Sequence, residues 1–106
     1  MHISSTHLGR LAILLTAIYA VAAQASSDAP TRQISASCAA CHGTNGHSVG
    51  GTPVLAGLKR DHFIKHMKDF QSGARVATVM HRHAKGYSDA EIEKLADHFA
   101  AQKRAP

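Results

Sequence analysis

Residues 37–46, SCAACHGTNG, hold both cysteines of the chain, Cys38 and Cys41, followed at once by His42. The order C-x-x-C-H is the attachment signature of c-type haem. Each thiol can add to one haem vinyl group, the two-residue spacer matches the gap between the vinyls on a helical turn, and the histidine then lies under the iron. The stretch therefore predicts one covalently bound haem c, with His42 as the proximal iron ligand.

Other uses of a cysteine pair fit the sequence less well. A Cys38–Cys41 disulfide would close a very short loop, and short loops give the least stabilisation. A structural zinc site takes four ligands, often as two cysteine pairs, and no second pair exists here. Thioredoxin-like chemistry would require a βαβ pattern that the chain does not show.

The first 25 residues have the pattern of an export signal. They combine a polar start ending in Arg10, an uncharged apolar run over 11–23, and the small-x-small sequence AQA at 23–25. The alternative is an uncleaved anchor, but a spanning helix needs about 20 apolar residues. We therefore expect a cleaved signal peptide at 1–25, a mature domain at 26–106 and a periplasmic location.

The size and charge of the mature chain limit the classes of function that it can have. Removal of residues 1–25 takes only Arg10 from the 12 Lys and Arg, which leaves 11 basic and 7 acidic side chains. Nucleic-acid binding is not expected of an exported chain with so modest a surplus of basic side chains. The surplus fits either a solvated face or steering towards an acidic partner protein. A domain of this size buries only about 60% of its unfolded surface, so a cofactor is expected to complete the core.

Helical periodicity dominates the sequence after the motif. A short helix opening near Pro30 and Thr31 is expected to run into the haem site, and residues 43–58, with five glycines, show no period. RDHFIKHMKDFQSG at 60–73 predicts an amphipathic helix with Asp61 as its cap and Gly73 as its stop. SDAEIEKLADHFAAQ at 88–102 predicts a last helix with a capping box.

No stretch alternates long enough for a strand, so an all-α domain is expected. The apolar positions that should face its core are Phe63, Ile64, Met67, Phe70, Ile92, Leu95, Ala96 and Phe99.

The second axial ligand of the iron decides between electron transfer and ligand binding. Met67 lies on the apolar stripe of its helix and fits core packing better. Met80 lies in a segment predicted to be irregular, where an unbranched thioether can reach the iron, and His81 and His83 are its competitors. The other histidines are interpreted as surface residues, namely His47, His62, His66 and His98.

These parts resemble class I c-type cytochromes over residues 31–102, with C-x-x-C-H near the mature start, a proline-containing loop TPVLAG at 52–57, and a methionine before the last helix. The resemblance implies that the carbonyl of Pro53 accepts the Nδ1 proton of His42 and that Leu55 packs on the haem face. It also implies Met80 as the second ligand.

A closer similarity comes from CAACHGTNGHSVG at 38–50, FQSGAR at 70–75 and above all VMHRHAKGYSDAEI at 79–92. These segments look like the cytochrome subunit of flavocytochrome c sulfide dehydrogenase, which implies an FAD-binding flavoprotein partner. The chain has one C-x-x-C-H where some members have two, so a mono-haem form is implied, and His81 and His83 depart from the motif. Arg75 is interpreted as either a propionate ligand or an exposed side chain.

Three functions remain open from the residues. An electron-transfer protein with His42 and Met80 on the iron leads, either as a sulfide dehydrogenase subunit or as a free carrier for other redox proteins, and it would catalyse nothing alone. A haem catalyst or gas binder would need an open sixth position. A copper module would use Met80, His81 and His83. For the first function, the expected docking rim is Lys59, Arg60 and Lys85.

Overall fold

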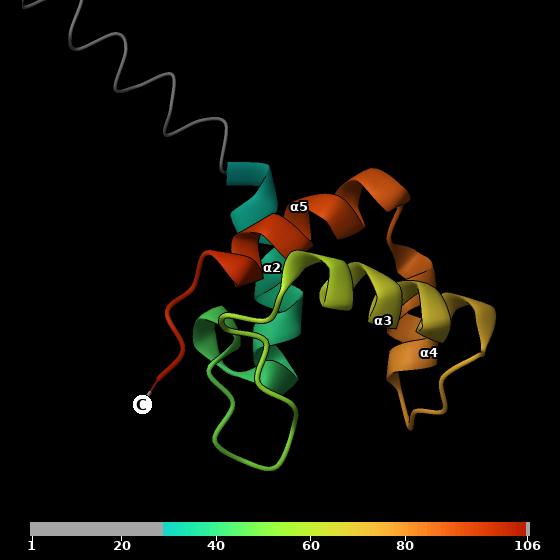
Figure 1. Ribbon diagram of the computed structural model, residues 1–106, viewed down its shortest axis with the longest axis horizontal. Coiled ribbons are helices and arrows are strands. Elements are labelled where there is room, and N and C mark those ends of the chain that lie inside the picture. Colours follow the sequence, from blue (N-terminus) through green and yellow to red (C-terminus); the bar gives the residue numbers. More distant parts are fainter. Residues whose placement is uncertain (1–28, 106) are drawn as a thin grey trace, which may run out of the picture. The chain divides into compact units, whose positions relative to one another are not determined.

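The structure is a computed structural model that describes residues 29–105. The predicted signal peptide lies outside the described residues. In chain order the elements are helix α2 (Ala29–His42), the 3₁₀ turn η1 (Thr44–Gly46), α3 (Arg60–Ser72), α4 (Met80–His83), the 3₁₀ turn η2 (Ala84–Gly86) and α5 (Asp89–Ala100) (Figure 1). No strand occurs within 29–105, so the all-α prediction is confirmed.

Helix α3 buries the stripe that its sequence predicted. Phe63 and Met67 are buried, and Ile64 and Phe70 pack against the same cluster. The helix ends at Gly73, whose φ of 81° is left-handed, as expected for a glycine stop. The predicted cap is wrong. Lys59 precedes the first turn without a side-chain cap bond, and Asp61 lies inside that turn, where its charge suits the helix dipole.

The segment around Met80 is more regular than expected. Its prediction as an irregular linker is wrong, because residues 80–86 form α4 and then η2. Ala84 is fully buried, and Gln71 Nε2 of α3 donates hydrogen bonds to the carbonyls of Ala84 (2.9 Å) and Tyr87 (3.0 Å). A four-residue helix has little periodicity to detect, so only tertiary packing reveals it.

Helix α5 has the predicted capping box. Ser88 Oγ accepts a bond from the Glu91 N–H at 3.3 Å, and the Glu91 carboxylate accepts one from the Ser88 N–H at 2.8 Å. Its predicted apolar positions are all buried, with Ile92, Leu95 and Ala96 fully enclosed and Phe99 nearly so.

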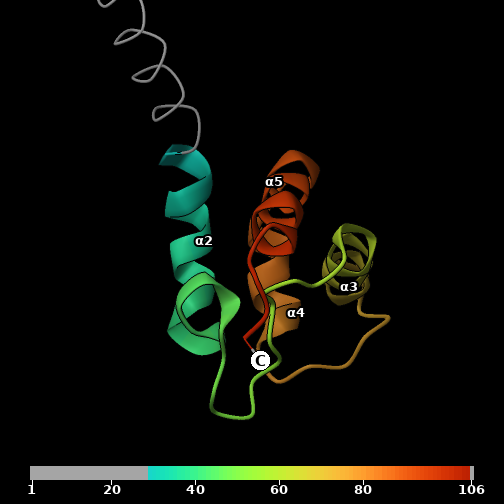
Figure 2. The ribbon, with the colours of Figure 1, turned by 60° about the vertical axis from the view of Figure 1, so that its left-hand side comes forward.

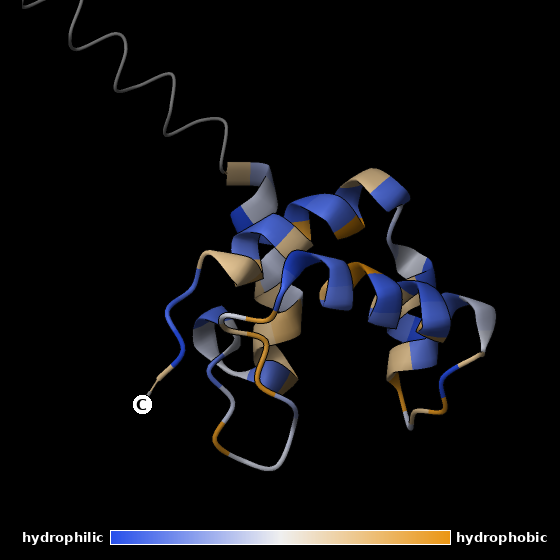
Figure 3. Ribbon diagram, in the orientation of Figure 1, coloured by the Kyte–Doolittle hydropathy of each residue, from blue (hydrophilic) through white to orange (hydrophobic). Residues whose placement is uncertain are grey.

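The core lies where α3 meets α5 and the α4–η2 segment, and it is closed by a ring contact between Phe63 and Phe99 at 5.6 Å between centroids. Figure 2 shows α5 between α2 and α3. In Figure 3, α3 and α5 alternate between apolar and polar residues, whereas apolar stretches also occur in the loops on both sides of the site. No helix within 29–105 has the length and apolar character needed to cross a membrane.

Candidate haem site

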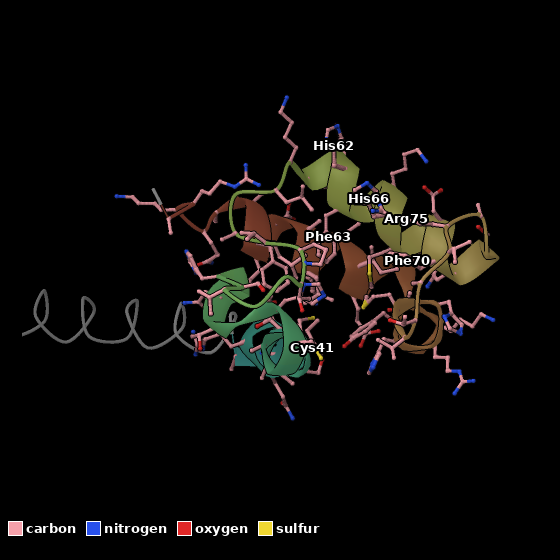
Figure 4. All side chains as sticks on the ribbon, turned by 90° about the horizontal axis from the view of Figure 1, so that it is seen from below. Cys41, His62, Phe63, His66, Phe70 and Arg75 are labelled. Carbon is pink, nitrogen blue, oxygen red and sulfur yellow. The ribbon has the colours of Figure 1, made fainter. Side chains whose placement is uncertain are left out.

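Both thiols of the motif are available on the last turns of α2. Cys38 is half-buried at the edge of the core, and neither cysteine forms a disulfide. Cys41 is exposed (Figure 4). Burial raises the pKa of the Cys38 thiol, and the nearby hydroxyls of Ser37 and Tyr87 partly oppose this shift. The pair is therefore free for two thioether bonds.

The histidine of the motif is fixed by a loop. His42 is buried, and its Nδ1 lies 2.7 Å from the carbonyl oxygen of Pro53, which is the contact that the family resemblance implies. Because the carbonyl can only accept, Nδ1 must carry the proton in this contact. Nε2 then keeps its lone pair, the state required of an imidazole that binds iron.

A glycine holds that loop in place. The backbone carbonyl of Gly46 accepts bonds from the N–H groups of Leu55 (2.9 Å) and Ala56 (3.2 Å). Gly46 has a φ of 79°, and a Cβ on it would lie 2.8 Å from the Ala56 nitrogen. The approach is possible only without a side chain. The contact fixes the chain just beyond Pro53. Nothing in the sequence distinguishes Gly46 from the other glycines of the loop.

The two methionines have separate environments. Met67 is 5% exposed inside the core, in agreement with its interpretation as a packing residue. Met80 begins α4, is partly buried, and packs at the edge of the same core as Cys38. His81 Nδ1 lies 3.0 Å from the carbonyl of Ala77 in its own loop, and His83 is exposed.

A contact that the sequence does not signal joins α2 to the segment after Met80. The hydroxyls of Ser37 and Tyr87 lie 2.5 Å apart, although the residues are 50 positions apart in the chain. Tyr87 is in turn held to α3 by the bond between Gln71 and its carbonyl. Ser37, next to Cys38, is thereby linked to the segment that follows Met80.

The residues present fit a haem. The two thiols and the His42 ring lie at one end of α2, and the adjoining apolar side chains are only partly buried, as expected of groups that contact an additional apolar surface. When bound there, the haem supplies a one-electron Fe(III)/Fe(II) couple. The partly buried apolar residues at the edge of the core are Ile34, Leu55, Leu58, Ile64, Phe70, Met80 and Tyr87.

Arg75 and His98 have distinct surroundings. Arg75 is exposed and its guanidinium lies 5.2 Å from the centre of the Phe70 ring. His98 was expected at the surface, but it packs edge-on against Phe99, and its Nε2 is buried without a partner among the described residues. That interpretation is wrong because His98 lies on the flank of α5 beside its apolar stripe.

The fold and the site define a small haem protein with a covalently bound cofactor. The chain belongs to the cytochrome c family, whose model matches residues 29–102. It has the small all-α fold of class I members, and the family match with the C-x-x-C-H spacing supports one covalent haem c and a role as an electron carrier.

The chain is similar to several curated cytochromes. Over 66 residues the chain is 44% identical to the cytochrome subunit of sulfide dehydrogenase of Chlorobaculum tepidum, covering 62% of this chain and 60% of that protein. It is 35% identical over 95 residues to cytochrome c4 of Pseudomonas aeruginosa (88% and 47%). It is 39% identical over 70 residues to a thiosulfate dehydrogenase electron acceptor of Thiomonas intermedia (64% and 32%). The chain thus spans less than two thirds of the length of each of these relatives.

Proposed function

We propose that this chain is the haem subunit that accepts single electrons from an FAD-containing sulfide dehydrogenase subunit. The observation that carries the proposal is the 44% identity with the cytochrome subunit of sulfide dehydrogenase, together with the motif around Cys38 and Cys41. In this proposal His42 and Met80 are the axial ligands. A Met/His pair fills both axial positions and raises the reduction potential, which suits an electron acceptor.

The proposal includes export. A signal peptide at 1–25 would send the chain to the periplasm, where the mature chain 26–106 would carry the haem. Mass spectrometry of the native protein tests the site of cleavage, and an N-terminus other than Ser26 would revise it.

The distribution of charge supports an acidic partner. Within 29–105 acidic side chains occur only on α3 and α5, whereas α2, α4 and the connecting segments carry basic ones alone. Such segregation steers association with a surface of opposite charge. The acidic side chains are Asp61, Asp69, Asp89, Glu91, Glu93 and Asp97.

We propose a smaller docking rim than the one that the sequence suggested. Arg60 donates to Asp97 (2.8 Å) and Glu93 (3.2 Å) of α5, so its charge is already compensated. No ion pair within 29–105 involves Lys59 or Lys85, whose charges remain available to a partner. Lys85 belongs to η2, in the segment that follows Met80.

Stopped-flow reduction of the haem tests the proposal. Sulfide would be mixed with the oxidised cytochrome alone, then in the presence of an FAD-binding subunit that co-purifies with it. Faster reduction with the flavoprotein is expected, and Lys85→Gln should slow association at low salt. Equal rates with and without the flavoprotein would overturn the proposal.

A free carrier is the alternative. The relatives include a thiosulfate dehydrogenase electron acceptor, so the same experiment with a thiosulfate dehydrogenase and thiosulfate tests another donor. Reduction by that enzyme, combined with no effect of the flavoprotein, would identify a free-standing carrier.

A further inference from the structure

Two histidines outside the haem site lie side by side on α3. His62 and His66 are four residues apart and so share one helix face. Their ring centroids are 6.4 Å apart and their planes differ by 29°. In the view of Figure 4, Phe63 lies between this pair and Cys41.

No structural role in the described fold accounts for the pair. No hydrogen bond or ion pair to either ring is found within 29–105, and His62 is exposed while His66 is half-buried. Burial lowers the pKa of His66, and the charges of Arg75 and His62 add to this effect. The charge of Asp69 opposes the shift. A neutral imidazole is the form that binds metal ions.

The helix turns beneath the pair are anchored in the core. Phe63 and Met67, the residues that follow the two histidines, are both buried in the core, and Gly73 terminates the helix in the left-handed conformation. Only side-chain rotation is needed to bring two imidazole nitrogens to one ion, at the roughly 2.0–2.1 Å typical of zinc–histidine bonds. A helical pair of histidines four residues apart is a recurring way to present two ligands to one ion.

Neighbouring charges limit the site to two protein ligands. Asp69 follows on the same face, but its carboxylate is 2.5 Å from Lys65 Nζ. No group of three or more His, Cys, Asp or Glu with metal-binding geometry occurs within 29–105. Water would complete the coordination, and the nearby charge of Arg75 would keep affinity moderate. Imidazole ligands favour Cu²⁺, Ni²⁺ and Zn²⁺, with Cu²⁺ bound most tightly.

We propose that His62 and His66 together chelate an exchangeable divalent transition-metal ion, Cu²⁺ in preference to Zn²⁺, on the outer face of α3. This site is separate from the haem and does not depend on the partner proposed above. Because both ligands are ordered on α3 only when the chain is folded, the ion should also stabilise the protein.

Calorimetric titration of the oxidised holoprotein with CuCl₂ tests the site, with His62→Gln, His66→Gln and the double variant. Loss of one histidine leaves a single imidazole in place of a chelate, so each single variant should bind its tightest Cu²⁺ roughly 10²-fold more weakly. A single imidazole binds no better than any other exposed histidine, so the double variant should bind no more weakly than either single variant. Unchanged Soret and far-ultraviolet spectra would show that the fold and haem are intact.

His83→Gln is the matched control, because His83 is also an exposed helical histidine. It should retain the tight site. Cu²⁺ should raise the unfolding temperature of wild type and of His83→Gln, EDTA should reverse the rise, and His62→Gln should abolish it. Equal affinity in wild type and His62→Gln would mean adventitious binding only and overturn the proposal. Loss of the tight site in His83→Gln would move it to α4 and overturn it equally.

Discussion

His42 Nδ1 lies 2.7 Å from the carbonyl oxygen of Pro53, so the histidine of the haem motif is oriented by a loop eleven residues further along the chain. The loop is tied back by Gly46 through Leu55 and Ala56, and to α5 by the bond from Gly57 N–H to the Phe99 carbonyl at 2.9 Å. The tautomer of His42 therefore depends on the folded loop as well as on α2.

Pro53→Ala should loosen this loop. Removal of the ring gives the unfolded chain more freedom, and we expect the free energy of unfolding to fall by about 0.4–1 kcal/mol. A weaker bond to Nδ1 makes the imidazole a poorer base, so the reduction potential should rise, as measured by potentiometric titration. Pro30→Ala, in the first turn of α2 and outside the loop, is the control and should leave the potential unchanged. A lower potential in Pro53→Ala would contradict the orienting role.

Gly46→Ala should be far more disruptive than the same change at Gly51. Both glycines have positive φ, but an added Cβ at Gly46 would meet Ala56 N at 2.8 Å, whereas at Gly51 it meets nothing within 4 Å. Strain alone costs about 1–3 kcal/mol at either position, and the collision adds to it only at Gly46. Urea unfolding of both variants measures the difference, and equal losses would rule out the close contact.

The sequence predicted those parts whose signal is local. The stripe of α5 and its Ser88–Glu91 box follow from spacing alone, and Gly73 stops α3 as predicted. Asp61 was wrong as a cap because an acidic residue suits the first turn as well as the position before it.

What could not be predicted depends on contacts between distant segments. The Ser37–Tyr87 bond joins residues 50 positions apart. The short helix α4 is stabilised by packing against α3, through the hydrogen bonds of Gln71 and the burial of Ala84. The compensated charge of Arg60 is of the same kind, since its partners lie on another helix.

Acid should weaken α5 through its capping box. Hydrogen bonds from the Ser88 backbone and hydroxyl lower the pKa of Glu91 below its ordinary 4.5. The folded pKa is depressed, so this contribution to stability is complete above the unfolded value of 4.5 and is lost as pH falls through the folded one. Urea unfolding of Glu91→Gln against wild type should show a difference that shrinks below about pH 4.5. Ser88→Ala should cost about 1 kcal/mol at neutral pH. A Glu91→Gln difference that is independent of pH would contradict the assignment.

Met80→Ala and Met67→Ala should separate iron ligation from core packing. If Met80 binds the iron, the oxidised protein has the weak far-red band of Fe–S(Met) coordination, and Met80→Ala should abolish it. Met67 is 5% exposed within the core, so Met67→Ala should keep the band while lowering the free energy of unfolding by about 2–5 kcal/mol through the cavity it leaves. Absorption spectra of the two holoproteins measure the band, and urea titrations measure the free energy of unfolding. Retention of the band in Met80→Ala would mean that another methionine sulfur binds the iron, and Met67→Ala in that background would then identify it. Absence of the band from the wild type would point instead to a histidine, and His81→Ala and His83→Ala would then separate the two candidates.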